Sequence, residues 1–304
     1  MNRHALARRG FTLVELLLSL IVTAIVGAAL VRMVLGQAKF MDQQEAWRGA
    51  RAVARGGVNR LVSDLRMVEA TNGMAAAVAG GQDFTVRVPY AFGIICNQPA
   101  AGAASIIVTT LPVDSAMYSA PGYSGFAVRR DDGTYDYYTA AAVNISPPAA
   151  LTTTCTAPAA PLAASPIPVA LSVNGSAAGR TIQLSTAALN PIPKMGQIVF
   201  LYRRIRYQFK NSVALPGRTG LFRAPVDGNA ADEEEIASPF APTARVNFYV
   251  LNNAVAQAAV PVPLGNTRGL ELVLDGMSER TPQGSAAPKT ANVRTSVFFE
   301  NRPD

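Results

Sequence analysis

The chain has 304 residues, of which 49% are apolar and 15% are charged, so it is too apolar for a disordered protein and long enough for one large or two small domains. Its single histidine, His4, lies in the first ten residues, a segment that we expect to be removed. The mature chain then has no histidine, which excludes histidine triads and histidine-ligated zinc. Two cysteines cannot build a Cys-rich metal site. We therefore expect no enzyme activity, no metal and no other cofactor.

The charge balance is mildly positive, with 27 Lys and Arg against 20 Asp and Glu. Loss of the first ten residues removes Arg3, Arg8 and Arg9 and leaves 27 − 3 = 24 positive side chains, a surplus of four. A surplus of this size suits solubility or an anionic membrane surface, and by itself it does not indicate a nucleic-acid-binding protein.

The segment from Phe11 to Val31 is apolar throughout and contains one charged residue, Glu15. A helix of that length covers roughly 30 Å, the thickness of the hydrocarbon core of a bilayer. Arg3, Arg8 and Arg9 precede it, and the positive-inside rule keeps that end in the cytoplasm. The segment is therefore predicted to cross the membrane once, with the rest of the chain exported.

Three kinds of segment fit this pattern. A secretory signal would be cut after a shorter apolar run, for example at Val26-Gly27-Ala28-Ala29, and a plain signal anchor would be retained. Neither has a use for Glu15. A carboxylate at membrane depth costs on the order of 2.5 to 3.5 kcal/mol on insertion scales, so it marks a functional site with a partner to be named.

The residues that distinguish these alternatives are RRGFTLVELLLSLI, from Arg8 to Ile21. They resemble the signal of type IV prepilins and type II secretion pseudopilins, in which a membrane peptidase cuts after the glycine and methylates the new amine. The resemblance implies that residues 1–10 are a leader cleaved after Gly10, that Phe11 becomes the N-methylated first residue, and that the apolar helix 11–31 is retained. It also implies that Glu15 pairs with the Phe11 amine of a neighbouring subunit, which has a positive charge only after cleavage.

The helix is predicted to continue as an amphipathic half over residues 32–70. Val58, Leu61, Leu65 and Val68 step by three, four and three, which places an apolar stripe on one face for packing on the globular domain. Gly56-Gly57 interrupts this half and predicts a bend or a local weakness. Thr71-Asn72-Gly73 supplies the stop.

Residues 71–304 are predicted to form a β-rich periplasmic domain, because apolar residues now alternate with polar ones. The clearest strands are 199–209, 246–250, 270–274 and 293–299, with shorter candidates at 84–88, 105–111, 126–129, 135–139 and 181–184. The expected fold class is α+β and pilin-like, a long N-terminal helix packed on a mostly antiparallel sheet.

An Ala- and Pro-rich stretch at 147–168 cannot pack a core, and we interpret it as a surface loop or linker. It contains Cys155, and Cys96 lies near a predicted strand. Two cysteines in an exported chain favour a disulfide, and the alternative is two free thiols.

The order QIVFLYRRIRYQF, TGLFR, RVNFYVL, RGLELVLDGMSER and VRTSVFFENR resembles the PilW family of minor pilins and the J-type minor pseudopilin. The ending Glu300-Asn301-Arg302 departs from the usual close and leaves the subfamily open. The mature length, 304 − 10 = 294 residues, is large for a major pilin and suits a minor subunit at the tip or in initiation.

Three hypotheses follow: a minor pilin of a type IV pilus, a J-type pseudopilin of type II secretion, and a membrane-anchored periplasmic enzyme or binding domain that borrowed the signal. The first two imply the same partners: prepilin peptidase, other minor and major pilins or pseudopilins, and the inner-membrane assembly platform. They also imply an inner-membrane protein with a cytoplasmic N-terminus and a periplasmic domain that later enters a pilus or pseudopilus fibre.

Two further patterns were weighed as sites. Asp227-Gly228-Asn229 with residues 232–235 is rich in oxygen ligands but lacks the twelve-residue spacing of a calcium loop, so a solvated acidic loop is preferred. Arg203, Arg204, Arg206 and Lys210 stand beside tyrosines, yet strand alternation sends Arg203 to the face opposite Arg204 and Arg206. They are not expected to form one nucleic-acid-binding patch. Asp131-Asp132-Gly133 is predicted to be a hairpin turn.

Overall fold

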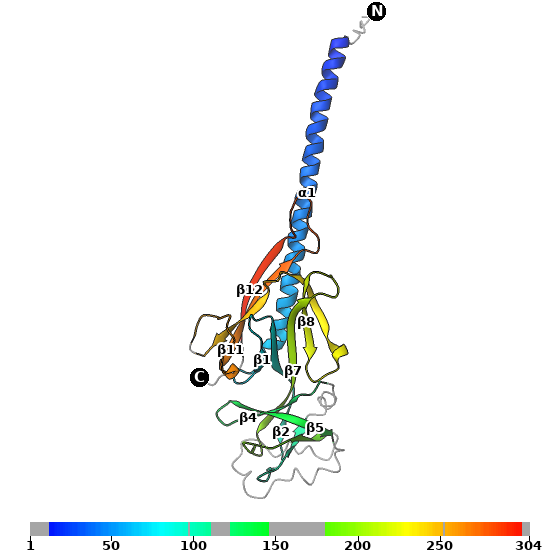
Figure 1. Cartoon of the computed structure of the whole chain (residues 1–304). Coiled ribbons are helices and arrows are strands. Elements are labelled where there is room, and N and C mark those ends of the chain that lie inside the picture. The colour runs from blue at the N-terminus through cyan, green and yellow to red at the C-terminus, as the bar shows by residue number, and fades with distance from the viewer. Residues whose placement is uncertain (1–11, 97, 111–121, 146–179, 252, 300–304) are drawn as a thin grey trace, which may run out of the picture.

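The computed structural model describes residues 12–96, 98–110, 122–145, 180–251 and 253–299. One long helix, α1 (Leu13–Leu65), stands on an antiparallel β domain, and its N-terminal half projects away from that domain (Figure 1). This arrangement confirms the expected α+β, pilin-like architecture. The two 3-10 turns are η4 (Ala230–Asp232) and η5 (Leu264–Asn266).

The strands form one twelve-stranded sheet in the order β1-β2-β3-β6-β5-β4-β7-β8-β9-β11-β10, with β12 paired to β11. Their bounds are β1 Met74–Ala77, β2 Asp83–Ile95, β3 Ser105–Thr110, β4 Gly125–Arg129, β5 Tyr135–Ile145, β6 Arg180–Thr186, β7 Ile198–Asn211, β8 Thr219–Pro225, β9 Glu234–Phe240, β10 Arg245–Val250, β11 Thr267–Met277 and β12 Thr290–Phe298. β2 and β7 are long and pair with each other along most of their length, so they tie the two ends of the domain together.

The domain has two main apolar cores along these strands. The larger one lies beneath α1 and joins Leu61 and Leu65 of the helix to Phe84, Tyr207 and Phe240 of the sheet. The second lies farther along β2 and β7, around Ile95, Phe126 and Leu201. Alternate residues of each strand point into these cores because successive side chains of a strand face opposite sides of the sheet. The helix is thus held by one end of the domain.

All nine strand segments expected from alternation are present, several of them longer than expected. The Asp131-Asp132-Gly133 turn also joins β4 to β5 as predicted, with a positive φ of 82° at Gly133. β1 was not foreseen because four small residues carry no clear period. β9 was also missed, since Glu234 and Glu235 were assigned to an acidic loop and instead begin this strand.

The helix ends at Leu65, before the predicted boundary at residue 70. The amide of Arg66 donates to the carbonyl of Val62, and that of Val68 donates to Leu65, which tightens the last turn. Val68, Glu69 and Ala70 are all buried in succession. A surface helix cannot bury three consecutive residues, because they point in directions about 100° apart, so the chain leaves the helix to fill the core.

The pair Gly56-Gly57 leaves α1 unbroken, and the two glycines have different surroundings. A Cβ on Gly57 would lie 2.9 Å from Cζ of the buried Phe240 ring, whereas nothing lies within 4 Å of a Cβ on Gly56. Gly57 therefore allows the helix to approach the sheet closely.

We expect opposite effects from the same substitution at these neighbouring sites. Gly56→Ala should raise the free energy of unfolding by roughly 0.5 to 1 kcal/mol. Alanine lowers the backbone entropy of the unfolded chain, and at this exposed helix position it meets no neighbouring atom. Gly57→Ala should lower the free energy of unfolding by about 1 to 3 kcal/mol through overpacking against Phe240. Denaturant unfolding of both variants checks this, and equal effects at the two sites would contradict it.

Candidate functional site: the N-terminal helix and its attachment

The described helix begins with a capping box made by Thr12 and Glu15. The backbone N–H of Thr12 donates to Oε2 of Glu15 at 3.1 Å, and the backbone N–H of Glu15 donates to Oγ1 of Thr12 at 3.3 Å. The Thr12 hydroxyl also donates to the same carboxylate oxygen at 3.2 Å. These bonds satisfy amides that the first turn leaves free. The single acid of the apolar segment is therefore held at the helix end by its own chain.

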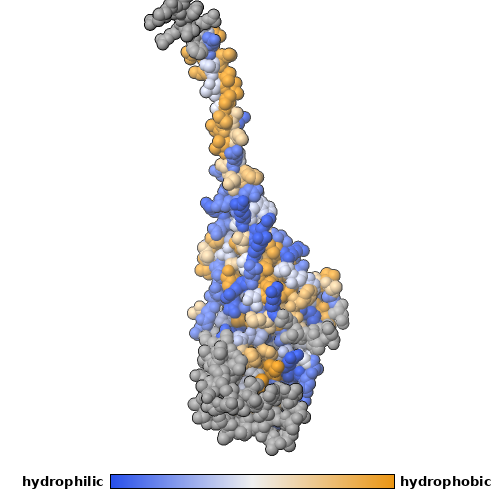
Figure 2. Space-filling view, turned by 180° about the vertical axis from the view of Figure 1, so that it is seen from behind, coloured by the Kyte–Doolittle hydropathy of each residue, from blue (hydrophilic) through white to orange (hydrophobic). Residues whose placement is uncertain are grey.

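The helix that follows presents apolar side chains in every direction. Leu13 is 77% exposed and Ile25 is 65% exposed, and the most apolar stretch of α1 has none of its residues buried in the domain. By length and composition α1 can cross a membrane. Figure 2 shows this apolar half as an orange stem above a mixed surface. Such a surface is stable only against lipid or other apolar helices.

The domain half of α1 is fastened to the sheet by a buried polar cluster of Asp64, Tyr207 and Arg223. Nε of Arg223 donates to Oδ2 of Asp64 at 2.9 Å, and the Tyr207 hydroxyl donates to the same oxygen. Asp64 is 9% exposed and Tyr207 is fully buried. Burial and the adjacent Asp64 carboxylate raise the pKa of Tyr207, so its hydroxyl stays protonated and remains a donor. The cluster links α1 to β7 and β8.

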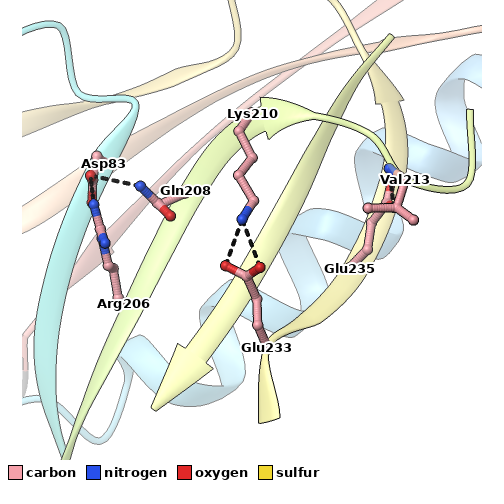
Figure 3. Close-up of polar contacts among 7 residues, drawn as sticks. All are labelled: Asp83, Arg206, Gln208, Lys210, Val213, Glu233 and Glu235. Carbon is pink, nitrogen blue, oxygen red and sulfur yellow. Dashed lines mark hydrogen bonds and ion pairs between the residues drawn. The ribbon is translucent and has the colours of Figure 1, made fainter. Parts of the chain in front are cut away.

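The basic residues of β7 are divided among separate partners (Figure 3). Arg206 makes a bidentate pair with Asp83, and Lys210 contacts both carboxylate oxygens of Glu233 at 2.6 and 2.7 Å. Arg204 pairs with Asp227 in the same way. Hydrogen bonds from Arg206 and Arg204 hold the pKa of Asp83 and of Asp227 below the usual 3.8, so both acids are ionised at neutral pH.

Arg203 lies apart from these pairs, as strand alternation predicts, with its guanidinium 4.3 Å from the centroid of the Tyr90 ring. Tyr202 is buried and offers no stacking surface. The basic residues of β7 therefore form no single patch.

The acidic segment 227–235 is exposed at Asp227, Glu233 and Glu234, as expected of a solvated segment, but its carboxylates also make contacts that its composition did not predict. Asp227 and Glu233 neutralise Arg204 and Lys210, and Glu234 lies 3.9 Å from Arg60 of α1. Glu235 accepts the N–H of Val213 at 2.9 Å and the hydroxyl of Ser212 (Figure 3). Because each carboxylate meets a different donor, the segment acts as counter-ions for α1 and β7.

Several predicted site residues cannot be placed. Gly10 and Phe11 lie outside the described residues, as does Cys155. Cys96 is half-buried at the end of β2, where its N–H donates to the carbonyl of Ile107 at 3.0 Å. The Cys96–Cys155 bridge therefore stays a prediction.

Sequence reasoning missed Thr12 and the Asp64 cluster. Thr12 could have been found, since Thr followed three residues later by Glu is a capping-box pattern. The contact between Asp64 and Tyr207 joins residues 143 positions apart, so no local sequence pattern predicts it.

A scan against family models matches residues 6–31 to the prokaryotic N-terminal methylation motif. The match contains the whole apolar segment together with Gly10 and Glu15. This motif fits the type IV pilin and pseudopilin superfamily. Searches of curated proteins and of solved structures found no match.

The motif accounts for the exposed apolar half of α1. Pilin-like subunits are processed by prepilin peptidase, held in the membrane by this helix and assembled with other pilins. The capping box of Thr12 and Glu15 lies inside the matched segment, just after the predicted cleavage position. The motif is therefore at one end of α1 and the β domain at the other.

Proposed function

We propose that this pilin-like protein is a minor pilin, which takes part in the initiation or the tip of a type IV pilus and has no enzymatic activity. The observation that carries the proposal is the motif at residues 6–31 on a helix whose apolar half is left bare by a large β domain. After cleavage at Gly10 the helix remains in the inner membrane, with its N-terminus cytoplasmic and the domain periplasmic. Apolar helices of neighbouring subunits then replace lipid around it.

A J-type minor pseudopilin of type II secretion is the second candidate, because the order of strand motifs around β7, β8, β10, β11 and β12 supports both subfamilies equally. The two candidates share processing and membrane anchoring. They differ in the fibre that the subunit enters and in the phenotype of its loss, which is absence of pili for one and a block in protein secretion for the other.

The test is purification of the processed subunit from membranes, followed by isolation of pili under native expression. A mass that fits a chain beginning at N-methylated Phe11, together with the subunit in sheared pili, supports the proposal. A native chain that begins at Met1, or a soluble chain that has lost residues 11–31, contradicts it. A processed subunit that is absent from pili, with secretion blocked on deletion, favours the pseudopilin.

We also propose that Cys96 and Cys155 form a disulfide in the exported domain. Closing a loop of that size contributes about 4 kcal/mol in the chain-entropy model. Mass spectrometry of the non-reduced protein should find the two cysteine peptides linked. A free-thiol titre of two per chain would reject the bridge.

A further inference from the structure

The exposed face of the domain half of α1 has a row of arginines. Arg48, Arg51, Arg55 and Arg66 follow steps of three and four, with Asn59 and Val62 between them, so they lie on the side opposite the buried Ala50, Ala54 and Leu61. All four arginines are exposed, and none makes an ion pair with the part of the chain that the structure describes. We call these four residues the arginine face. Figure 2 shows hydrophilic surface where the apolar stem ends.

A groove runs beside this row. It has a volume of about 500 Å³ and lies between Val58, Asn59, Val62 and Arg66 of α1 and residues 295–298 of β12. Valine side chains line it together with the Phe298 ring, which is 60% exposed. The arginine face thus continues into a surface that can receive an apolar side chain.

Lipid headgroups do not reach the arginines from Arg48 to Arg55. If the apolar span ends near Val31, Arg48 lies about 25 Å farther along the helix at 1.5 Å per residue. The Debye length at physiological ionic strength is about 8 Å. The attraction of these side chains to a membrane surface is therefore screened, which favours a protein as their partner.

A second copy of the chain is a poor partner, because most of its described acidic side chains already form ion pairs or hydrogen bonds within the chain. The seven ion pairs of the described chain use Asp64, Asp83, Asp131, Asp136, Asp227, Glu233 and Glu234. Among the described residues, only Glu45 and Glu279 have a carboxylate with no hydrogen bond or ion pair. Glu45 precedes Arg48 on the same helix, so the described residues offer no row of unpaired acids.

We infer that the arginine face and its groove bind the acidic helix face of a different pilin-like subunit. This inference rests on the proposed function, because helices of neighbouring subunits come together when the fibre assembles. Packing a row of arginines against another helix costs desolvation energy unless each charge is paired. The partner helix therefore carries Asp or Glu side chains at spacings of three and four, with an apolar side chain that enters the groove. Assembly through this face is heterotypic.

The test places a photo-reactive phenylalanine derivative at Asn59 of the full-length chain in native membranes, with the exposed Ile192 near the β4–β5 turn as the control position. Irradiation should join position 59 to another pilin-like subunit at a peptide that contains Asp or Glu, as identified by mass spectrometry. The double variant Arg51→Glu/Arg55→Glu should lower that yield about tenfold. The control variant Arg129→Glu/Arg280→Glu, which changes the net charge by the same amount, should leave the crosslinking yield unchanged. Replacing the partner's crosslinked acids with Lys should restore the yield of the Arg51→Glu/Arg55→Glu variant.

Three outcomes would overturn the inference: a crosslink between two copies of this chain, a crosslink to lipid, or a heterotypic crosslink that charge reversal does not weaken. Restoration by the partner's substitutions shows that the double variant is folded. Each sample is also checked for the mass of the processed chain. Failure of processing would reject the proposed function, whereas correct processing with the wrong crosslink would reject only the arginine-face partner.

Discussion

The variant Glu15→Ala should be cleaved after Gly10 at the normal rate and recovered about tenfold less often in assembled fibres. Cleavage depends on the bond between Gly10 and Phe11, whereas Glu15 acts after it. The carboxylate costs on the order of 2.5 to 3.5 kcal/mol at membrane depth, and an amine at Phe11 of a neighbour offsets that cost. Gly10→Ala or a bulkier residue should instead impair cleavage and leave the amine unformed.

Two companion variants separate the charge of Glu15 from its role as a helix cap. Glu15→Gln keeps an acceptor for the Thr12 amide, since Gln also forms capping boxes, but it cannot form an ion pair. Thr12→Ala removes the hydroxyl and keeps the charge. If charge pairing drives assembly, Glu15→Gln fails like Glu15→Ala while Thr12→Ala incorporates well. Normal recovery of Glu15→Gln in sheared fibres would reject the pairing role.

Replacing Asp64 with alanine should lower the free energy of unfolding by about 2 to 4 kcal/mol, because the change leaves two buried donors unpaired. The Arg223 side chain is mostly buried, and Tyr207 is fully buried, so solvent does not reach its hydroxyl to replace the carboxylate. This loss in the free energy of unfolding is smaller than the one expected for a fully buried ion pair, because the Arg223 side chain is 23% exposed. The loss falls on the attachment of α1 to β7 and β8.

Denaturant unfolding of the full chain in detergent, with hydrogen exchange of α1, would measure this effect. Amides over residues 50–65 should exchange faster than those of β4 and β5, because the cluster ties only the helix. Asp131→Ala is the matched control, since it removes a carboxylate whose pair with Lys194 is largely exposed, and it should cause no measurable change. An equal response of the two variants would show that the Asp64 cluster does not hold the helix.

Much of the fold was predictable because the signals are local. The alternation in β7 and β11 reflects a strand with one face in a core, and the steps of three and four from Val58 to Leu65 reflect a helix on a sheet. The end of α1 was not predictable in this way. Val68 continues the apolar steps of the helix, but the chain leaves the helix after Leu65 so that Val68, Glu69 and Ala70 can all be buried.

The N-terminal motif was also predictable from the sequence, because a peptidase and a membrane recognise a short continuous segment. Arg8 to Ile21 contains the basic leader, the glycine, the acid and the apolar run in consecutive order. The acidic stretch 227–235 shows the opposite case. Its composition predicted a solvated loop, and its acids do stay exposed, but their pairs with Arg204, Lys210 and Arg60 depend on elements that fold next to it.

The sequence alone determined the N-terminal methylation motif, the apolar segment that can cross a membrane and most of the segments that become helix and strand, because each depends on residues a few positions apart. Only the tertiary structure decided which charges are neutralised internally and which stay free. Asp64 meets Tyr207 across 143 positions, whereas Arg48, Arg51, Arg55 and Arg66 make no ion pair within the described chain. Electrostatic pairing depends on distance in space, and the fold sets that distance.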